Sequence, residues 1–269
     1  MSKPPDRPLQ RTRLDAADLA AAWEEHAAAF IAWARKPGHD SYWLFHRDQF
    51  LELVPPPGRR TLDLGCGEGR LSRDLKALGH DLVAVDLSRT MLAAAKEADS
   101  DLETHLADAA DLPFDNASFD LVVAFMSLQD MNDMEGAIGQ AARVLEPGGS
   151  LCLAVVHPFN SAGRFAGDDA SSPFVVEGSY LKRFRYADNF VRDGLEITVV
   201  SEHRPIQAYV RALSDAGLMV ERLRETDVPD SGIVRPRSRR WQRIPQFLHM
   251  RAETAMSCRL RARLFVVRV

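Results

Sequence analysis

The stretch that decides the fold is Leu62-Asp63-Leu64-Gly65-Cys66-Gly67-Glu68-Gly69. It begins as the end of a buried strand, and three alternate glycines follow where a helical pattern starts. Glycine lets the backbone take positive φ and approach a ligand that a Cβ atom would push away. The stretch therefore predicts a cofactor-binding turn between a first strand and a first helix. The alternative, for a glycine-rich turn taken alone, is a simple tight connection.

Two phosphate-binding turns fit this glycine spacing poorly. The dinucleotide fingerprint is G-x-G-x-x-G, whereas this chain has G-x-G-x-G with Arg70 at the later place. A P-loop needs Gly-Lys-Ser or Gly-Lys-Thr, and neither follows residue 69. The spacing thus disfavours a nicotinamide site and excludes a P-loop nucleotide site.

The residues beyond this turn alternate between short apolar runs and helical patterns, as in βαβ units around a mostly parallel sheet. The sequence therefore predicts an α/β fold that is Rossmann-like and doubly wound, with a mostly parallel seven-stranded sheet. The predicted strands are residues 61–64, 82–86, 103–107, 120–124, 151–156, 218–223 and 264–269. The predicted helices are residues 69–78, 91–98 with an N-cap at Ser88, 134–145 and 205–216.

Two segments do not follow this alternation of short apolar runs and helical patterns. Residues 159–203 are rich in aromatic side chains, and Asp193-Gly194 lies between alternating apolar positions, which predicts a β-hairpin cap inserted after the fifth strand. Helical spacing from residue 15 or 18 to residue 36, and again from residue 40 to residue 55, predicts an N-terminal helical lid. We expect a flexible tail over 1–14, a lid over 15–58 and a main domain over 59–269.

Composition limits the partners and the location. The chain has 38 acidic residues against 34 Lys plus Arg, a net charge of −4, so no overall positive field attracts nucleic acid. Its 3 cysteines are far apart, unlike a disulfide framework or close zinc ligands. Neither a signal peptide nor a membrane span is visible. We expect a cytoplasmic monomer or homodimer with no nucleic-acid partner, no metal and no membrane span.

Asp86 supplies a second chemical element, at the end of the second predicted strand. A carboxylate at this place can accept hydrogen bonds from the two hydroxyls of a ribose. The alternative is that Asp86 only caps the helix that begins near Ser88. Together with the glycine turn, Asp86 favours an adenosine-containing ligand, without specifying its reaction.

Five blocks in this order make the chain resemble the class I S-adenosylmethionine-dependent methyltransferases. Within them it is similar to the small-molecule branch that includes the ubiquinone and menaquinone biosynthesis methyltransferases. The resemblance runs from about residue 60 to the C-terminus. Its blocks are residues 62–69, 85–88, 107–109 with 112–114, 118–122, and 143–149. It implies methyl transfer from S-adenosylmethionine to a small organic acceptor, with S-adenosylhomocysteine as the product.

The resemblance also implies which positions contact the cofactor. Gly65 and Gly67 admit its methionine part, and Asp63 orients the loop or the amino group. Asp86 binds the ribose and Asp108 the adenine amino group. The remaining implied contacts are Leu87 and Ala109 on the ring, Phe125 near the amino-acid part, Cys66 and Met91. Because a sulfonium is a cation, carboxylates and aromatic faces suit it.

A base would assist any phenol, amine or thiol acceptor, which must lose a proton. The predicted base is His157, at the exit of the fifth strand, and the alternative is a structural histidine that bonds the following loop. Gln129 and Asp130, after the fourth strand, are the next candidates for touching acceptor or base, or else they cap the following helix. No metal is needed, because alignment of donor and nucleophile lowers much of the barrier.

Aromatic residues gather in the lid and in the cap, the two regions that cover the cofactor and form the acceptor pocket in the resembling enzymes. We expect Tyr42 to contact the cofactor carboxylate, and Trp33 and Tyr180 to contact the acceptor. Core packing is the alternative for aromatic residues at helical spacing. An oxygen or nitrogen acceptor is favoured and a carbon acceptor is left open. The alternative functions are a non-catalytic S-adenosylmethionine-binding protein and, less favoured, an RNA or protein methyltransferase.

Overall fold

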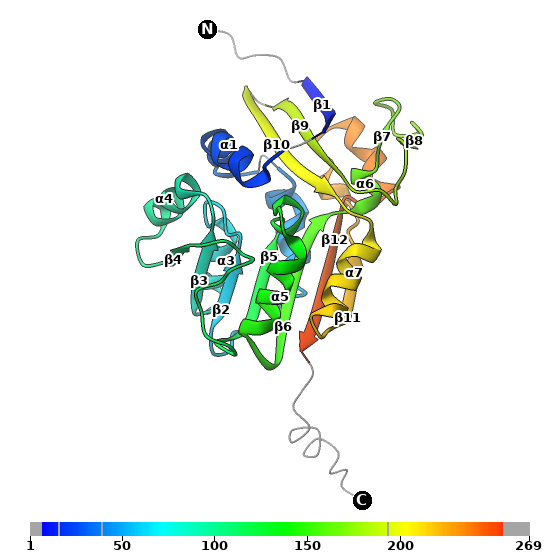
Figure 1. Ribbon diagram of the computed structural model, residues 1–269. Helices are drawn as coiled ribbons and strands as arrows, with labels where there is room; N and C mark the ends of the chain where they lie inside the picture. Colours follow the sequence, from blue (N-terminus) through cyan, green and yellow to red (C-terminus); the bar gives the residue numbers. More distant parts are fainter. Residues whose placement is uncertain (1–6, 16, 39, 193, 255–269) are drawn as a thin grey trace, which may run out of the picture.

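The computed structural model describes residues 7–15, 17–38, 40–192 and 194–254. A seven-stranded sheet runs through it in the order β11-β12-β6-β5-β2-β3-β4 (Figure 1). The strands are β2 Thr61–Leu64, β3 Leu82–Asp86, β4 Glu103–Leu106, β5 Phe119–Phe125, β6 Leu145–Val156, β11 Leu218–Glu225 and β12 Phe247–Thr254. Neighbours from β6 to β4 are parallel, and β12 is antiparallel to β6 and β11. The predicted doubly wound α/β fold is confirmed.

Helices cover both faces of this sheet, which explains why its central strands are apolar throughout. Leu62 and Leu64 pack into the core on the face of α5 and α7, whereas Ala84 packs with side chains of α3 and α4 on the opposite face. The helices are α3 Arg70–Ala77, α4 Arg89–Ala98, α5 Met134–Val144 and α7 Ile206–Asp215. The Ser88 hydroxyl accepts the Met91 N–H at 3.0 Å, so the predicted N-cap of α4 is confirmed.

A smaller antiparallel sheet, ordered β1-β9-β10, contains the predicted hairpin. Its strands are β1 Arg7–Leu14, β9 Phe184–Arg192 and β10 Leu195–His203. Together with helix α1, Leu19–Ala34, it lies over the end of the large sheet at which the parallel strands finish (Figure 1). A π-helical turn, Tyr42–His46, then leads into α2, Arg47–Leu51.

Two predictions at the ends of the chain need correction. Residues 7–14 were expected in a flexible tail, but they form β1, because they pair with β9 and Arg11 donates two hydrogen bonds to Asp188 at 2.8 and 2.7 Å. The partner lies 177 positions away, so no local pattern reveals it. The seventh strand of the sheet among the described residues is β12, which the sequence did not predict, and the predicted strand at 264–269 falls outside the described residues.

Short elements complete the connections. After β6 come α6 Pro158–Ser161 and the two-stranded pair of β7 Gly163–Phe165 with β8 Phe174–Val176. Single 3-10 turns follow β5 at Leu128–Asp130 and lie between β11 and β12 at Asp230–Gly232, and a longer 3-10 helix follows at Pro236–Gln242. Within the part of the chain that the structure describes, no helix has the length and apolar character to cross a membrane.

Candidate functional site

A cavity of about 200 Å³ lies at the carboxyl ends of β2, β3 and β5. Its walls come from the glycine turn, from the ends of β3 and β4, and from the loop of residues 126–133 that follows β5, here named the β5 loop. Helix α1 closes it with Ala20, Trp23 and Phe30. The cavity therefore stands where open α/β sheets bind ligands, beyond the carboxyl ends of the strands.

The glycine turn has the backbone that its sequence predicts. Gly65, Gly67 and Gly69 have φ values of 74°, 56° and 78°. A Cβ atom on Gly65 would lie 2.5 Å from the Cβ of Ser127, so this residue lets the turn touch the β5 loop. A Cβ atom on Gly67 would meet no atom within 4 Å, which leaves open space beside the turn. The turn can thus bring its backbone close to a ligand.

Asp63 and Asp86 are brought together at this turn. Ser72 donates a hydrogen bond from its hydroxyl to Oδ2 of Asp63 at 2.6 Å, and burial raises the pKa of the Asp63 carboxyl to about 7. Asp86 accepts the Gly67 and Ser88 N–H groups, each at 2.8 Å. Burial raises the pKa of Asp86 as well. Asp86 therefore holds the turn and begins α4, and each of its oxygens keeps a lone pair for a ligand.

An apolar slot lies beside these acids. Leu87 is half exposed, whereas Met91 and Ala109 are buried, and all three line the cavity together with Asp108. Oδ1 of Asp108 accepts the Ala110 N–H at 2.9 Å, which fixes the side chain at the cavity edge. The cavity brings together every residue predicted to contact the cofactor except Tyr42, namely Asp63, Gly65, Cys66, Gly67, Asp86, Leu87, Met91, Asp108, Ala109 and Phe125.

Tyr42 was expected to contact the cofactor carboxylate, but it lies behind the cavity and does not line it. Its buried hydroxyl donates to Oδ2 of Asp74 at 2.6 Å, and its ring packs edge-on against Phe125. Its neighbour Arg70 lines the cavity instead, stacked on the Tyr42 ring with 4.2 Å to the centroid and donating to Asp40 at 2.8 Å. Arg70 is the only Lys, Arg or His among the described lining residues.

His157 also lies away from the cavity, so the structure does not support it as the base. Its Nδ1 accepts the Phe159 N–H at 3.0 Å, and its Nε2 lies 3.0 Å from Oε1 of Glu225. Because Nδ1 accepts, Nε2 carries the proton and donates it to Glu225. Burial lowers the pKa of His157, against the opposing effect of Glu225. The structural alternative holds, because His157 caps α6.

Of the four residues predicted to contact the acceptor, Asp130 lines the cavity, whereas Gln129, Tyr180 and Trp33 do not. The amide of Gln129 donates to the Met126 carbonyl at 2.6 Å. The Tyr180 hydroxyl accepts the Ile206 N–H at 3.1 Å, and the Trp33 ring packs edge-on against Phe190 at 4.9 Å. Tyr180 and Trp33 thus serve the packing of cap and lid, which is the core alternative for aromatic residues.

The aromatic residues of the lid that do face the cavity are Trp23 and Phe30, in edge-to-face contact at 5.1 Å. Polar contacts hold their helix in place. Glu24 accepts hydrogen bonds from the hydroxyls of Ser88 at 2.5 Å and Thr90 at 2.6 Å. These bonds lower the pKa of Glu24 and join α1 to the first turn of α4. Sequence reasoning placed aromatic residues in the lid but did not identify which of them face inward.

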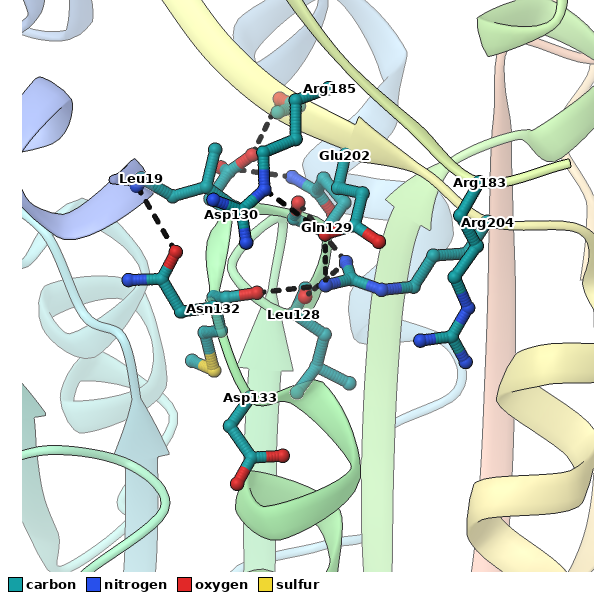
Figure 2. Close-up of polar contacts among 12 residues, drawn as sticks. Leu19, Leu128, Gln129, Asp130, Asn132, Asp133, Arg183, Arg185, Glu202 and Arg204 are labelled. Atoms are coloured by element: carbon teal, nitrogen blue, oxygen red, sulfur yellow. Dashed lines mark hydrogen bonds and ion pairs between the residues drawn. The ribbon is translucent and has the colours of Figure 1, made fainter. Parts of the chain in front are cut away.

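The β5 loop is held by both covering segments, as Figure 2 shows. Arg204, which is buried, donates to the Met131 carbonyl at 2.9 Å and to Glu202 at 3.0 Å. From the lid, the Leu19 N–H donates to Oδ1 of Asn132 at 3.2 Å. Sequence reasoning missed Arg204 and Asn132, because their contacts lie far along the chain. Cap and lid thus fix this wall of the cavity.

Comparison with known proteins agrees with this geometry. Residues 62–153 match a family model described as a methyltransferase domain. A demethylmenaquinone methyltransferase from Renibacterium salmoninarum is 38% identical over 98 residues, 36% of this chain and 41% of that protein. A malonyl-[acyl-carrier protein] O-methyltransferase from Salmonella typhimurium is 38% identical over 131 residues, 47% of this chain and 51% of that protein. The chain thus spans about half the length of these curated relatives.

A solved structure extends the match to most of the fold. An S-adenosylmethionine-dependent methyltransferase from Mesorhizobium loti superposes with a TM-score of 0.65 at 26% identity, over 80% of this chain and 98% of that one. Together with the domain match, it confirms the resemblance to class I S-adenosylmethionine-dependent methyltransferases.

Proposed function

Because this chain carries a methyltransferase domain of the class I S-adenosylmethionine-dependent type, we propose that it transfers a methyl group from S-adenosylmethionine to an oxygen or nitrogen atom of a small organic acceptor. One observation carries the proposal. A single cavity unites a glycine turn, the acids Asp63, Asp86 and Asp108, and an apolar slot. That donor set suits a ligand with a ribose, an adenine ring and positive charge.

The adenosine part fits the slot between β3 and β4. Asp86 uses its remaining lone pairs for the ribose hydroxyls, and Asp108 accepts from the adenine amino group. Leu87, Met91 and Ala109 supply apolar faces for the ring. The half-exposed side chain of Leu87 gains most from this burial, since its apolar surface otherwise meets water.

The amino-acid part fits the opposite side of the turn. Arg70 pairs with the ligand carboxylate, because a guanidinium binds carboxylates with two parallel hydrogen bonds. Asp63, with its pKa raised to about 7, becomes fully ionised when an ammonium approaches. S-adenosylmethionine supplies an activated methyl group on a sulfonium. The role of the protein is therefore to align the acceptor with that group and to exclude water.

We assign the exclusion of water to the lid of residues 15–58. Trp23 and Phe30 on α1 form the cover, and Glu24 fastens it to α4. Ligand entry then requires α1 to move, which breaks only a few polar contacts at this end. Residues 59–269 form the methyltransferase domain in this proposal, and residues 159–203 form its cap.

The acceptor is a small molecule in this proposal, as the names of the curated relatives suggest. They include a demethylmenaquinone and a malonyl-[acyl-carrier protein] methyltransferase, which leaves the type of acceptor atom to experiment. The net charge of −4 argues against nucleic acid as the acceptor. A cytoplasmic monomer or homodimer remains part of the proposal.

The direct test is formation of S-adenosylhomocysteine from S-adenosylmethionine with a panel of phenols, amines and quinones. We expect turnover with at least one class, above the slow rate without acceptor. Tight binding of S-adenosylmethionine without turnover on any panel member would instead support the non-catalytic alternative.

A further inference from the structure

We propose that Asp130 is the catalytic group that accepts the proton lost by the acceptor oxygen or nitrogen during methyl transfer. The inference rests on the proposed function. Asp130 ends the 3-10 turn after β5 and lines the cavity. Ser127 and Met131, on either side of it, lie against Gly65 of the glycine turn. This places the carboxyl on the wall next to the turn, across the cavity from the adenosine slot in this proposal.

Two side-chain donors orient the carboxyl group. The Ser201 hydroxyl donates to Oδ1 at 2.5 Å, and the Gln129 amide donates to Oδ2 at 3.1 Å. Each carboxylate oxygen can accept a second hydrogen bond, and part of the residue stays open to the cavity. The group is thus held in place and still able to receive a proton.

The other acids of the described cavity wall have different tasks. Asp86 and Asp108 accept backbone N–H groups, and Asp133 caps α5 through the Gly136 N–H at 2.8 Å. Glu68 pairs with Arg73 at 2.9 Å. Asp63 is fully buried beside Ser72, at the base of the turn. Asp130 is the wall acid whose partners all come from the β5 loop and the cap, the segments on the acceptor side.

Several charged and titratable groups surround Asp130. Arg204, which directly follows the cap, clamps the β5 loop, and Glu202 pairs with both Arg204 at 3.0 Å and Arg185 at 3.4 Å (Figure 2). Tyr186 on β9 and Tyr209 on α7 stay protonated, because burial raises the pKa of both hydroxyls. Of these groups, Arg204 favours the ionised form of Asp130, whereas burial opposes it.

Burial raises the pKa of Asp130 to about 8, against the opposing effects of Ser201, Gln129 and Arg204. A base works best when its pKa lies near the working pH, since it is then partly ionised and still basic enough. An ordinary aspartate with a pKa near 4 would be a much weaker base. The geometry and the basicity of Asp130 thus favour the same role.

The chemical step then balances. A lone pair of the acceptor oxygen or nitrogen forms the new bond to the methyl carbon, and the pair of the broken carbon–sulfur bond stays on sulfur. The proton of the acceptor passes to the Asp130 carboxylate. The cationic sulfonium and the anionic carboxylate both become neutral, so the net charge does not change.

The first test needs no acceptor. The affinities of S-adenosylmethionine and S-adenosylhomocysteine are measured by calorimetry from pH 6 to 9, in the unmodified protein and in Asp130→Asn. The two ligands share their amino-acid group, so their affinity ratio isolates the sulfonium charge. We expect the ratio to rise about tenfold through pH 8 as the carboxyl ionises, and to stay flat in Asp130→Asn.

The second test measures turnover with the best acceptor of the panel. Asp130→Asn should lower kcat by at least about 100-fold, the usual effect of a lost general base, while the Kd of S-adenosylhomocysteine changes less than about twofold. Ser201→Ala should move the acidic limb of the pH profile to higher pH, because it removes a hydrogen-bond donor to the ionised carboxylate of Asp130. Thr198→Val is the matched control on β10, since the Thr198 hydroxyl bonds only to Asn189 among the described contacts.

The failures are distinguishable. An affinity ratio that is flat in both proteins, or a kcat of Asp130→Asn within about threefold of the unmodified enzyme, would overturn the role of Asp130 and leave the proposed function standing. Absence of binding by both ligands in the unmodified protein would overturn the proposed function itself.

Discussion

The glycine-turn end of the cavity and its β5-loop end are built in different ways. At the glycine turn, the functional residues lie at the ends of the consecutive strands β2 and β3 and in the turns that directly follow them. At the β5 loop, Asp130 depends on Ser201, which is 71 positions away, and the loop carbonyls depend on Arg204. A site made of local segments can be read from its motif, whereas a site made of distant segments appears only in the fold.

Gly65→Val should have the largest effect at the glycine-turn end of the cavity. Positive φ and a Cβ atom 2.5 Å from Ser127 together exclude a branched side chain, so we expect loss of S-adenosylhomocysteine binding by more than about 100-fold and a lower Tm. Calorimetry and thermal unfolding measure both. Gly139→Ala on α5, where a Cβ atom meets nothing within 4 Å, is the control and should leave binding unchanged.

Arg70→Ala tests whether the glycine-turn end of the cavity binds the amino-acid part of the ligand separately from its adenosine part. Loss of a charged hydrogen bond to the ligand carboxylate should weaken S-adenosylhomocysteine by about 1.5–3 kcal/mol. Methylthioadenosine has no amino-acid part, so its affinity should not change. Equal losses for both ligands would show that Arg70 supports the fold of the turn rather than the carboxylate.

The two buried histidines behind the cavity should make the free energy of unfolding depend on pH. His46 and His249 stack 4.9 Å apart, and burial lowers the pKa of His249 to about 3 and that of His46 well below its ordinary value. A neutral buried histidine stabilises the fold above its unfolded pKa near 6.5, and that stability is lost as the pH falls from there toward the folded value. Each such group contributes about 1.4 kcal/mol per pH unit in this window.

His249→Leu should therefore flatten the acid side of the stability curve relative to the unmodified protein, in denaturant unfolding from pH 7 to 4.5. The comparison must be made between variants, because the raised pKa values of Asp63 and Asp130 give the opposite slope in the same window. His105→Gln, on the exposed edge of β4, is the control. An unchanged difference between His249→Leu and the unmodified protein at all pH values would contradict this assignment.

Glu24→Gln should give the smallest effect, because it changes only the polar contact between the lid helix α1 and the first turn of α4. The side chain is exposed, so its hydrogen bonds to Ser88 and Thr90 contribute about 0.5 kcal/mol or less. We expect release of S-adenosylhomocysteine to become about twofold faster in stopped-flow measurements, with Glu25→Gln as the neighbouring control. An identical rate in both variants would mean that α1 is held by its apolar contacts alone.

The same contrast explains what the sequence could predict. The glycine turn, Asp86 and Asp108 follow from strand ends and turns, which local patterns describe well. His157 was placed correctly at the exit of β6, but that position does not tell where the ring points, and Pro158 starts a helix that His157 caps. The same holds for Tyr42, because its position in the lid does not tell that its hydroxyl donates a hydrogen bond to Asp74 on α3.

The strands at the ends of the chain were missed because their pairing is distant. β1 has few apolar residues of its own and depends on β9. In β12 the polar residues His249, Arg251 and Glu253 alternate with buried apolar residues, and the strand pairs with β6 on one side and β11 on the other. Arg251 is matched by Glu221 across the strand pair.

The central claim is that the cavity beside the glycine turn binds S-adenosylmethionine, and calorimetry on the full chain tests it most directly. We predict one molecule of S-adenosylhomocysteine bound per chain, and a loss on the order of 1–3 kcal/mol in Asp86→Ala, which removes charged hydrogen bonds to the ribose. An affinity unchanged by Asp86→Ala, or binding of NADH with no binding of S-adenosylmethionine or S-adenosylhomocysteine, would contradict the account.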